Sequence, residues 1–146
     1  MRAMSVSNDD AHQAAVLSQD VQPVHLDPDY AARTRFGRPI VPGAFAISRV
    51  AGLLGTGLVD LRTHYIVTHR FAAEFLRPVF VGDELRIQAT VTAWGEEDGR
   101  LSVDVEVRNQ RNRRVLLGTA DLVVLALTDH VGSDQAGVRT TRPPSA

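Results

Sequence analysis

Residues 43–55, GAFAISRVAGLLG, decide the fold predicted for this chain. The stretch is apolar on nearly every helical face, and Ser48 and Arg49 are its only polar side chains. A helix that is apolar all round is normally a buried helix, and many small residues here allow other backbone to approach closely. Its glycines weaken the intrinsic helix propensity, so contacts with other parts of the chain must stabilise it. We therefore expect a helix that is enclosed by the rest of the protein.

The second half of the chain supplies strands that can enclose this helix. Residues 84–94 and 101–107 alternate strictly between apolar and polar side chains, as strands with one buried face do. The segment between them has the composition of a hairpin turn. Residues 65–75 predict another long strand, and residues 115–127 form an almost continuous apolar run. The pattern predicts an α+β domain in which four long antiparallel strands curl around one helix.

Two shorter helices are predicted before the central one. Residues 11–17 are good helix formers and follow capping side chains at residues 8–10. Asp27 and Pro28 combine a capping carboxylate with a first-turn proline, so a short helix should begin there. The predicted boundaries are residues 1–7 for a flexible N-terminus, 8–127 for a single domain and 128–146 for a disordered tail.

The composition excludes several classes of protein. A chain of 146 residues, 44% of them hydrophobic, can form one domain with a proper core. A net charge of −1 argues against the strongly basic surface that a nucleic-acid-binding protein usually has. Without cysteine there is no disulfide, thiolate nucleophile or sulfur-ligated metal, and no histidine or carboxylate spacing suits a metal site. The longest apolar run, residues 122–127, is too short for a membrane span, and the first residues are too polar for a signal peptide. We expect a cytoplasmic protein without a membrane or nucleic-acid partner.

The most informative polar pair lies in residues 20–25, DVQPVH. Pro23 disfavours the helical conformation for the residue before it, so we predict that Asp20 and His25 lie on an irregular loop. If the loop turns, the carboxylate and the imidazole converge, and such a pair can hold a water molecule and transfer a proton. Spacing alone leaves a structural alternative open, because loop aspartates usually cap turns and single histidines usually pack or face solvent.

The sequence around this pair resembles the MaoC-like (R)-specific enoyl-thioester hydratases. Residues 18–43 are similar to that family's Asp-x-Asn-Pro-x-His pattern, to the helix that follows it and to the glycine that opens the central helix. Residues 75–85, FLRPVFVGDEL, resemble the family's strand-ending Phe-x-x-Pro-Val-x-x-Gly-Asp segment, and Asn109-Gln110 resembles its hairpin pair. The resemblance covers residues 18–127 and implies the hotdog fold, a curved antiparallel sheet around a long helix.

The resemblance implies a hydro-lyase that adds water syn across a trans-2-enoyl thioester, or removes it from an (R)-3-hydroxyacyl thioester. In the family's catalytic positions, Asp20 would activate the water that attacks C3, and His25 would pass a proton to C2. The backbone N–H groups of Gly43 and Ala44 would stabilise the enolate oxygen. Ser48 matches a family serine beside the catalytic water loop, so the resemblance implies a hydrogen bond between Ser48 and the loop that carries Asp20. The expected substrate is a CoA or acyl-carrier-protein thioester, with no separate cofactor.

Three residues depart from the family pattern. Gln22 stands where the family has an asparagine, Gln19 where it has a glycine, and Pro42 where it has a histidine. Gln22 is expected to support the turn between Asp20 and His25 in a different way. Pro42, beside the expected substrate site, removes an imidazole and an N–H. The sequence also shows no convincing strand before the first helix. Such changes fit an enzyme of a specialised biosynthetic pathway that acts on an unusual acyl chain.

Two features outside these motifs give weaker hypotheses. Arg111 and Arg113 form a basic cluster with Arg114 at a predicted hairpin tip. They either face solvent or contact the phosphates of CoA or of a pantetheine carrier. His69 shares the inward parity of Phe71 on its predicted strand, which favours a hydrogen-bonded core or interface residue over a ligand.

Two other functions stay open at this point: a hotdog acyl thioesterase, and a non-catalytic acyl-binding subunit of a hetero-oligomer. The Asp-x-x-Pro-x-His block argues against the thioesterase. The presence of Asp20 and His25 argues against the non-catalytic subunit, whereas Gln22 and Pro42 mildly favour that alternative. Because hotdog sites generally lie between two subunits, the resemblance also implies a homodimer.

Overall fold

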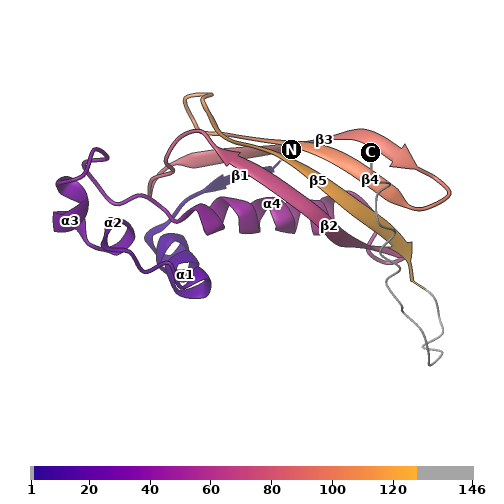
Figure 1. Ribbon diagram of the computed structural model, residues 1–146, viewed down its shortest axis with the longest axis horizontal. Coiled ribbons are helices and arrows are strands. Elements are labelled where there is room, and N and C mark those ends of the chain that lie inside the picture. The colour runs from indigo at the N-terminus through magenta and orange to yellow at the C-terminus, as the bar shows by residue number, and fades with distance from the viewer. Residues whose placement is uncertain (1, 128–146) are drawn as a thin grey trace, which may run out of the picture.

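The computed structural model describes residues 2–127, in which a single antiparallel sheet lies over one long helix (Figure 1). In chain order the elements are β1 (Arg2–Ser5), α1 (Asn8–Ser18), α2 (Pro23–Leu26), α3 (Pro28–Ala32), α4 (Gly43–Gly57), β2 (His64–Phe75), β3 (Glu84–Gly95), β4 (Arg100–Arg108) and β5 (Arg114–Ala126). The strand order across the sheet is β1-β3-β4-β5-β2, and all neighbouring strands are antiparallel. The predicted α+β architecture is confirmed.

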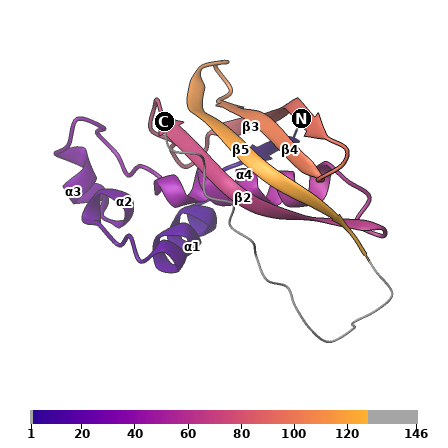
Figure 2. The ribbon, with the colours of Figure 1, turned by 45° about the vertical axis from the view of Figure 1, so that its right-hand side comes forward.

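The core lies between α4 and one face of the sheet. Figures 1 and 2 show α4 running beneath the strands, with α1, α2 and α3 gathered at one end. The helix buries Phe45, Ala46, Val50 and Leu54. Alternate residues of the two central hairpin strands complete the core: Leu85, Ile87, Leu101, Val103, Val105 and Val107. This alternation is the same period-two pattern that predicted the strands.

The sheet does not enclose α4 on every side. Ser48, Arg49, Ala51 and Gly52 are exposed on the helix face that points away from the strands. Arg49 forms an ion pair with Asp10 of α1 at the edge of this face. The predicted sheet curled around a helix is present, but in the single protomer the five-stranded open sheet covers only one side of α4, so the helix is not buried on every face.

The N-terminal segment forms a strand, which corrects the prediction that no strand precedes the first helix. Strand β1 pairs with β3 over four residues, from Arg2 opposite Ile87 to Ser5 opposite Glu84. Val6 follows it and is only 2% exposed. Four residues are too few to show a period-two pattern, so this strand cannot be predicted from the local sequence. It is formed by its pairing with β3.

The helix starts agree with the predictions in part. α3 begins as predicted, with the Asp27 carboxylate accepting hydrogen bonds from two backbone N–H groups of the first turn. α1 is capped by Ser7, in a reciprocal capping box with Asp10, and not by residues 8–10 as predicted. Part of the predicted irregular loop forms the single helical turn α2. Pro23 occupies its first position, where a proline costs no hydrogen bond.

An irregularity in β2 moves His69 out of the predicted core. The register of β2 against β5 shifts between Thr68 and Arg70, so that the inward-facing parity changes by one residue. Ile66 before the shift and Phe71 after it both pack against the core. His69 lies at the shift and is exposed. It is therefore not a core residue of this chain, and a bulge of this kind cannot be deduced from parity.

Three further sequence predictions concern the tail, membranes and metals. The predicted disordered tail, residues 128–146, lies outside the described residues. Over residues 2–127, no helix has the length and hydropathy required to cross a membrane. In the same part of the chain, no group of three His, Cys, Asp or Glu side chains is placed to hold a metal ion.

Candidate active site

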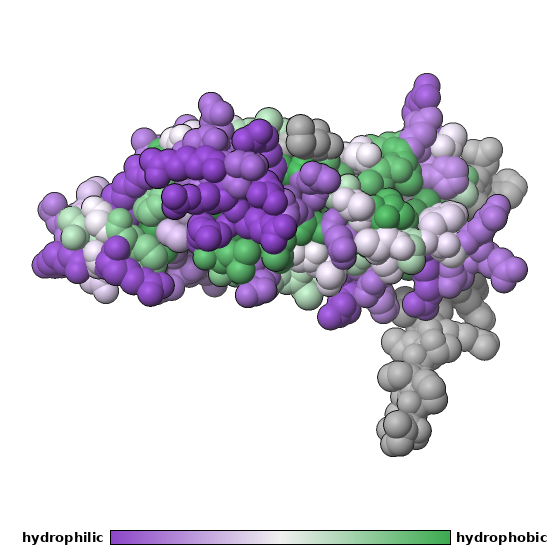
Figure 3. All heavy atoms as spheres, turned by 90° about the horizontal axis from the view of Figure 1, so that it is seen from above, coloured by the Kyte–Doolittle hydropathy of each residue, from purple (hydrophilic) through white to green (hydrophobic). Residues whose placement is uncertain are grey.

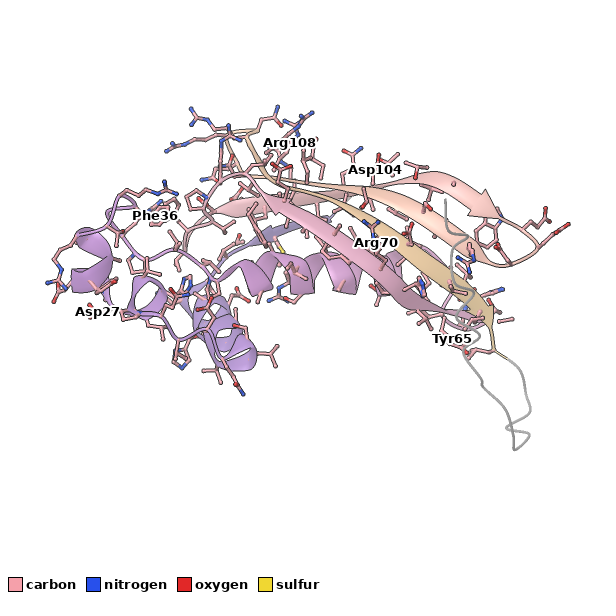
Figure 4. All side chains as sticks on the ribbon, in the orientation of Figure 1. Asp27, Phe36, Tyr65, Arg70, Asp104 and Arg108 are labelled. Carbon is pink, nitrogen blue, oxygen red and sulfur yellow. The ribbon has the colours of Figure 1, made fainter. Side chains whose placement is uncertain are left out.

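A cavity of about 360 Å³ opens where the short helices meet the start of α4 and the end of β2. Asp20 and His25 contribute its polar side chains on one side, and Pro42 and Gly43 contribute the start of α4. The remaining wall is largely apolar and includes Phe36, Ile40, Phe45, Phe75, Leu76, Val79 and Leu116. Figure 4 shows Phe36 between the short helices and the sheet. The cavity thus combines an apolar wall, a polar pair and a helix N-terminus.

The structure brings the carboxylate of Asp20 against the imidazole of His25. The distance from Asp20 Oδ2 to His25 Nε2 is 3.3 Å, and the two side chains are 36% and 7% exposed. The approach depends on Gln19, which ends α1 in the left-handed conformation with φ 57° and turns the chain back. Pro23 then starts α2, and this one turn brings His25 back toward Asp20. The convergence predicted for residues 20–25 is present.

A main-chain contact fixes the tautomer of His25. Its Nδ1 lies 2.7 Å from the carbonyl oxygen of Ile40. A carbonyl can only accept, so Nδ1 carries the hydrogen, and in the neutral ring Nε2 is the free acceptor facing Asp20. The Ile40 backbone is itself held by its N–H bond to the Val24 carbonyl and by a β-bridge to Phe80. The imidazole is therefore oriented with its basic nitrogen in the cavity.

Gln22 keeps Asp20 ionised. The Gln22 amide Nε2 donates a hydrogen bond of 2.7 Å to Asp20 Oδ1. This hydrogen bond, helped by the nearby His25 and opposed by desolvation, holds the pKa of Asp20 below its ordinary value. Gln22 departs from the family asparagine, yet it supports the turn through its side chain. The second carboxylate oxygen, Oδ2, stays directed at His25.

The start of α4 leaves hydrogen-bond donors open to the cavity. Pro42 is the N-cap residue, and no side chain caps this helix. Within residues 2–127, the N–H groups of Gly43 and Ala44 have no protein acceptor. A serine or aspartate at the N-cap would occupy such donors, whereas proline cannot. A Cβ at Gly43 would lie 3.0 Å from Cζ of Phe75, which is closer than an ordinary contact, so a larger residue would displace the Phe75 ring by a few tenths of an ångström.

Five predicted site residues are not among those that line this cavity: Gln22, Ala44, Ser48, Arg111 and Arg113. Ser48 is exposed, and its hydroxyl donates 2.8 Å to the Phe45 carbonyl of its own helix. The predicted hydrogen bond between Ser48 and the Asp20 loop is therefore not formed, since the hydroxyl is satisfied locally. Arg111 and Arg113 line a separate, neighbouring hollow.

Sequence reasoning assigned no role to several residues of the cavity wall. Ile40 acts through its carbonyl group, which no side-chain pattern can reveal. Phe75 and Arg77 lie in a segment that resembles the family, but nothing in the sequence shows that the end of β2 turns toward α4. Arg35 and Phe36 were likewise visible only as part of a motif, and here the Arg35 guanidinium lies 5.0 Å from the centre of the Phe36 ring.

Comparison with known proteins gives consistent matches. The family model described as "MaoC like domain" matches residues 1–114. An (R)-specific enoyl-CoA hydratase of Aeromonas caviae is 38% identical over 106 residues, which are 73% of this chain and 77% of that protein. A 3-hydroxybutyryl-CoA dehydratase of Methylorubrum extorquens is 31% identical over 86 residues, which are 59% of this chain and 53% of that protein.

Solved structures show the same architecture. The (R)-hydratase from Aeromonas caviae involved in PHA biosynthesis has a TM-score of 0.77 and 32% identity, and the match covers 84% of this chain and 90% of that one. The R-hydratase PhaJ1 from Pseudomonas aeruginosa has a TM-score of 0.76 and 26% identity, with 93% and 88% covered. These similarities confirm the hotdog fold that the sequence predicted.

Proposed function

The chain belongs to the MaoC-like family, and we propose that it catalyses the reversible syn addition of water to a trans-2-enoyl thioester. The product is an (R)-3-hydroxyacyl thioester, so the enzyme is a hydro-lyase. The observation that carries the proposal is the approach of Asp20 Oδ2 to His25 Nε2, 3.3 Å apart, in an apolar-walled cavity at the start of α4. The similarity to hydratases and a dehydratase supports the same reaction.

The hydrogen-bonding state of the pair determines how water is bound. In the state that binds water, Asp20 is ionised and His25 is neutral with its hydrogen on Nδ1, so that Asp20 Oδ2 and His25 Nε2 are both acceptors. One water molecule can donate one hydrogen to each of them, which leaves the lone pairs of its oxygen directed away from both groups. That oxygen attacks C3 of the enoyl group while Nε2 takes one proton. The other hydrogen stays on the new hydroxyl group, and the negative charge of Asp20 stabilises the imidazolium.

The same proton completes the reaction. Addition at C3 moves negative charge onto the thioester oxygen and gives an enolate. The N–H groups of Gly43 and Ala44, at the positive end of the α4 dipole, stabilise that oxygen. His25 Nε2 then returns its proton to C2, which restores the starting state of the pair, an ionised Asp20 and a neutral His25. Water, base, acid and oxyanion donors are thus supplied without a metal or cofactor, and we expect chelators to leave the activity unchanged.

The location and the oligomeric state are part of the proposal. Strand β2 is a sheet edge of 12 residues, with Tyr65, Val67 and Phe75 each more than 40% exposed. A long edge with apolar side chains favours pairing with another chain, and Phe75 joins this edge to the cavity. A second copy pairing along β2 would give the homodimer that the family resemblance implies, and light scattering of the purified protein measures it. We propose a cytoplasmic location for the enzyme.

One assay separates the proposal from its alternatives. Purified protein is given a short trans-2-enoyl-CoA, and the loss of the conjugated enoyl absorbance is followed together with the release of free thiol. Hydration removes the absorbance without thiol. Thiol release would instead indicate a thioesterase, and neither change would indicate a non-catalytic subunit.

Matched variants test the residues. Asp20→Asn and His25→Ala should each reduce kcat by about a hundredfold or more, with unchanged circular dichroism. Asp104→Asn and His12→Ala are the controls, because both residues are exposed and lie outside the cavity and away from the β2 edge. Undiminished hydration in the first two variants would contradict the assignment of the site.

A further inference from the structure

A second hollow of about 220 Å³ adjoins the candidate active site. Arg77 and Pro78 belong to the walls of both hollows. Arg38 contributes to the second one, and the hairpin between β4 and β5 adds Arg111 and Arg113. Figure 3 shows the molecule from above, with hydrophilic side chains concentrated toward one end, and Figure 4 shows nitrogen-tipped side chains around the strand end that carries Arg108. Two hollows with a shared wall suit a ligand that has a reactive end and a separate charged group.

The arginines of this hollow have no internal counterions. Within residues 2–127, no carboxylate forms an ion pair with Arg38, Arg77, Arg111 or Arg113. By contrast, the arginines that flank the same hairpin, at positions 108 and 114, both pair with one glutamate. Asp83 lies in the wall, but it is buried and its oxygens accept hydrogen bonds from a backbone N–H and a glutamine amide. Four arginines against this one carboxyl group leave the hollow with a net positive charge, which favours an anion.

The positions of these arginines are fixed by hydrogen bonds and stacking. Asn109 Oδ1 accepts hydrogen bonds of 3.1 Å from the backbone N–H groups of Arg111 and Arg113, which sets the hairpin turn. Arg77 donates 2.7 Å to the main chain at the start of β5. The Arg38 guanidinium lies 4.1 Å from the centre of an aromatic ring in the wall. Each anchored arginine keeps further N–H donors, and guanidinium groups suit the oxygens of a phosphate.

We infer that this hollow binds the phosphate of the pantetheine arm on which the acyl thioester is carried. The inference rests on the proposed function, because it places the reactive end of that ligand beside Asp20 and His25. The thioester and the phosphate are separated by the pantetheine chain, so their sites must be neighbouring but distinct, as the two hollows are. CoA and the prosthetic arm of an acyl carrier protein share this phosphate chemistry.

Kinetics on three substrates test the inference. The same enoyl group is offered on CoA, on a phosphopantetheinylated carrier protein and on N-acetylcysteamine, which has no phosphate. For the double variant Arg111→Ala/Arg113→Ala, kcat/KM on a phosphate-bearing substrate should fall about tenfold relative to kcat/KM on the N-acetylcysteamine thioester. The loss should lie mainly in KM. Arg100→Ala is the control, because Arg100 belongs to the hairpin between β3 and β4 and pairs with Asp98.

The outcomes identify the source of the phosphate. A relative loss on both CoA and the carrier protein supports the site, because both carry the pantetheine phosphate. A loss on CoA alone would assign the arginines to the nucleotide phosphates of CoA, a loss on the carrier protein alone would assign them to a protein contact, and either would overturn the inference. An equal loss on all three substrates would show a structural effect and overturn the inference, as would no loss on any.

Calorimetry with free CoA and free pantetheine separates this inference from the proposed reaction. Weaker CoA binding by the double variant, with no hydration by the wild type, would retain the phosphate site and reject the hydratase. Unchanged binding of CoA together with unchanged kinetics on the carrier protein would reject the site alone.

Discussion

Gln19 carries a conformational cost that a glycine would remove. It ends α1 with φ 57° and ψ 18°, in the left-handed region that side chains with a Cβ avoid. The residue is exposed, and the only hydrogen bond of its backbone N–H is to the Val16 carbonyl, which glycine would keep. The substitution Gln19→Gly should therefore stabilise the fold while the chain still turns toward Asp20.

The size of the effect is a difference of two terms. The left-handed conformation costs a residue with a Cβ about 1–2 kcal/mol, and the greater freedom of glycine in the unfolded chain costs about 0.5–1 kcal/mol. The net stabilisation is about 0.5–1 kcal/mol. In a domain of this size, that corresponds to a rise in Tm of about 2–4 °C.

Thermal unfolding of three variants checks this reasoning. Gln19→Ala keeps the Cβ and the strain, so its Tm should not rise. Asn112→Gly is the matched control, because Asn112 also has a positive φ, 58°, but asparagine tolerates it well and the gain should be smaller. The reasoning is refuted if Gln19→Gly fails to exceed the wild type, or if Gln19→Ala gains as much.

Three more substitutions follow from the contacts. Gln22→Ala removes the main cause of the lowered pKa of Asp20, so the pKa of the Asp20 carboxyl group, measured by NMR titration of its side chain, should rise; an unchanged pKa would contradict the role of the amide. Asp83→Ala leaves the Phe80 N–H and the Gln110 amide without their acceptor and should lower the free energy of unfolding in urea by about 2–3 kcal/mol. Leu54→Ala, at a side chain 1% exposed beneath the sheet, should lower it by about 3 kcal/mol, and a loss below 1 kcal/mol would argue against a tight core there.

The sequence contains the long elements of the fold but not its irregular parts. Period-two alternation predicted β3 and β4, and the apolar stretch predicted α4, because these elements each bury one regular face. Strand β1 and the shifted register at His69 were missed. A four-residue strand is too short to show an alternation of apolar and polar residues, and a bulge is a property of two paired strands. Neither feature can therefore be predicted from the local sequence of one strand.

The polar pair of the site was predictable, and its support was not. Asp20 and His25 lie close in the sequence, and a proline between them predicts a bend. The contact that orients His25 comes from the carbonyl of Ile40, 15 residues away, through an atom that every residue has. Ser48 was placed by resemblance alone, and its hydroxyl bonds within its own helix. The contacts that orient a catalytic residue thus depend on which groups the tertiary structure brings together, and residue type alone does not predict them.

The central claim is that one water molecule, held by two groups 3.3 Å apart, supplies both atoms added to the double bond. The direct measurement is hydration of a trans-2-enoyl thioester in D₂O, with the configuration of deuterium at C2 determined by NMR. Because Asp20 and His25 act from one side of the substrate, the account predicts a single diastereomer with deuterium and hydroxyl on the same face. Anti addition, or a mixture of configurations at C2, would contradict it.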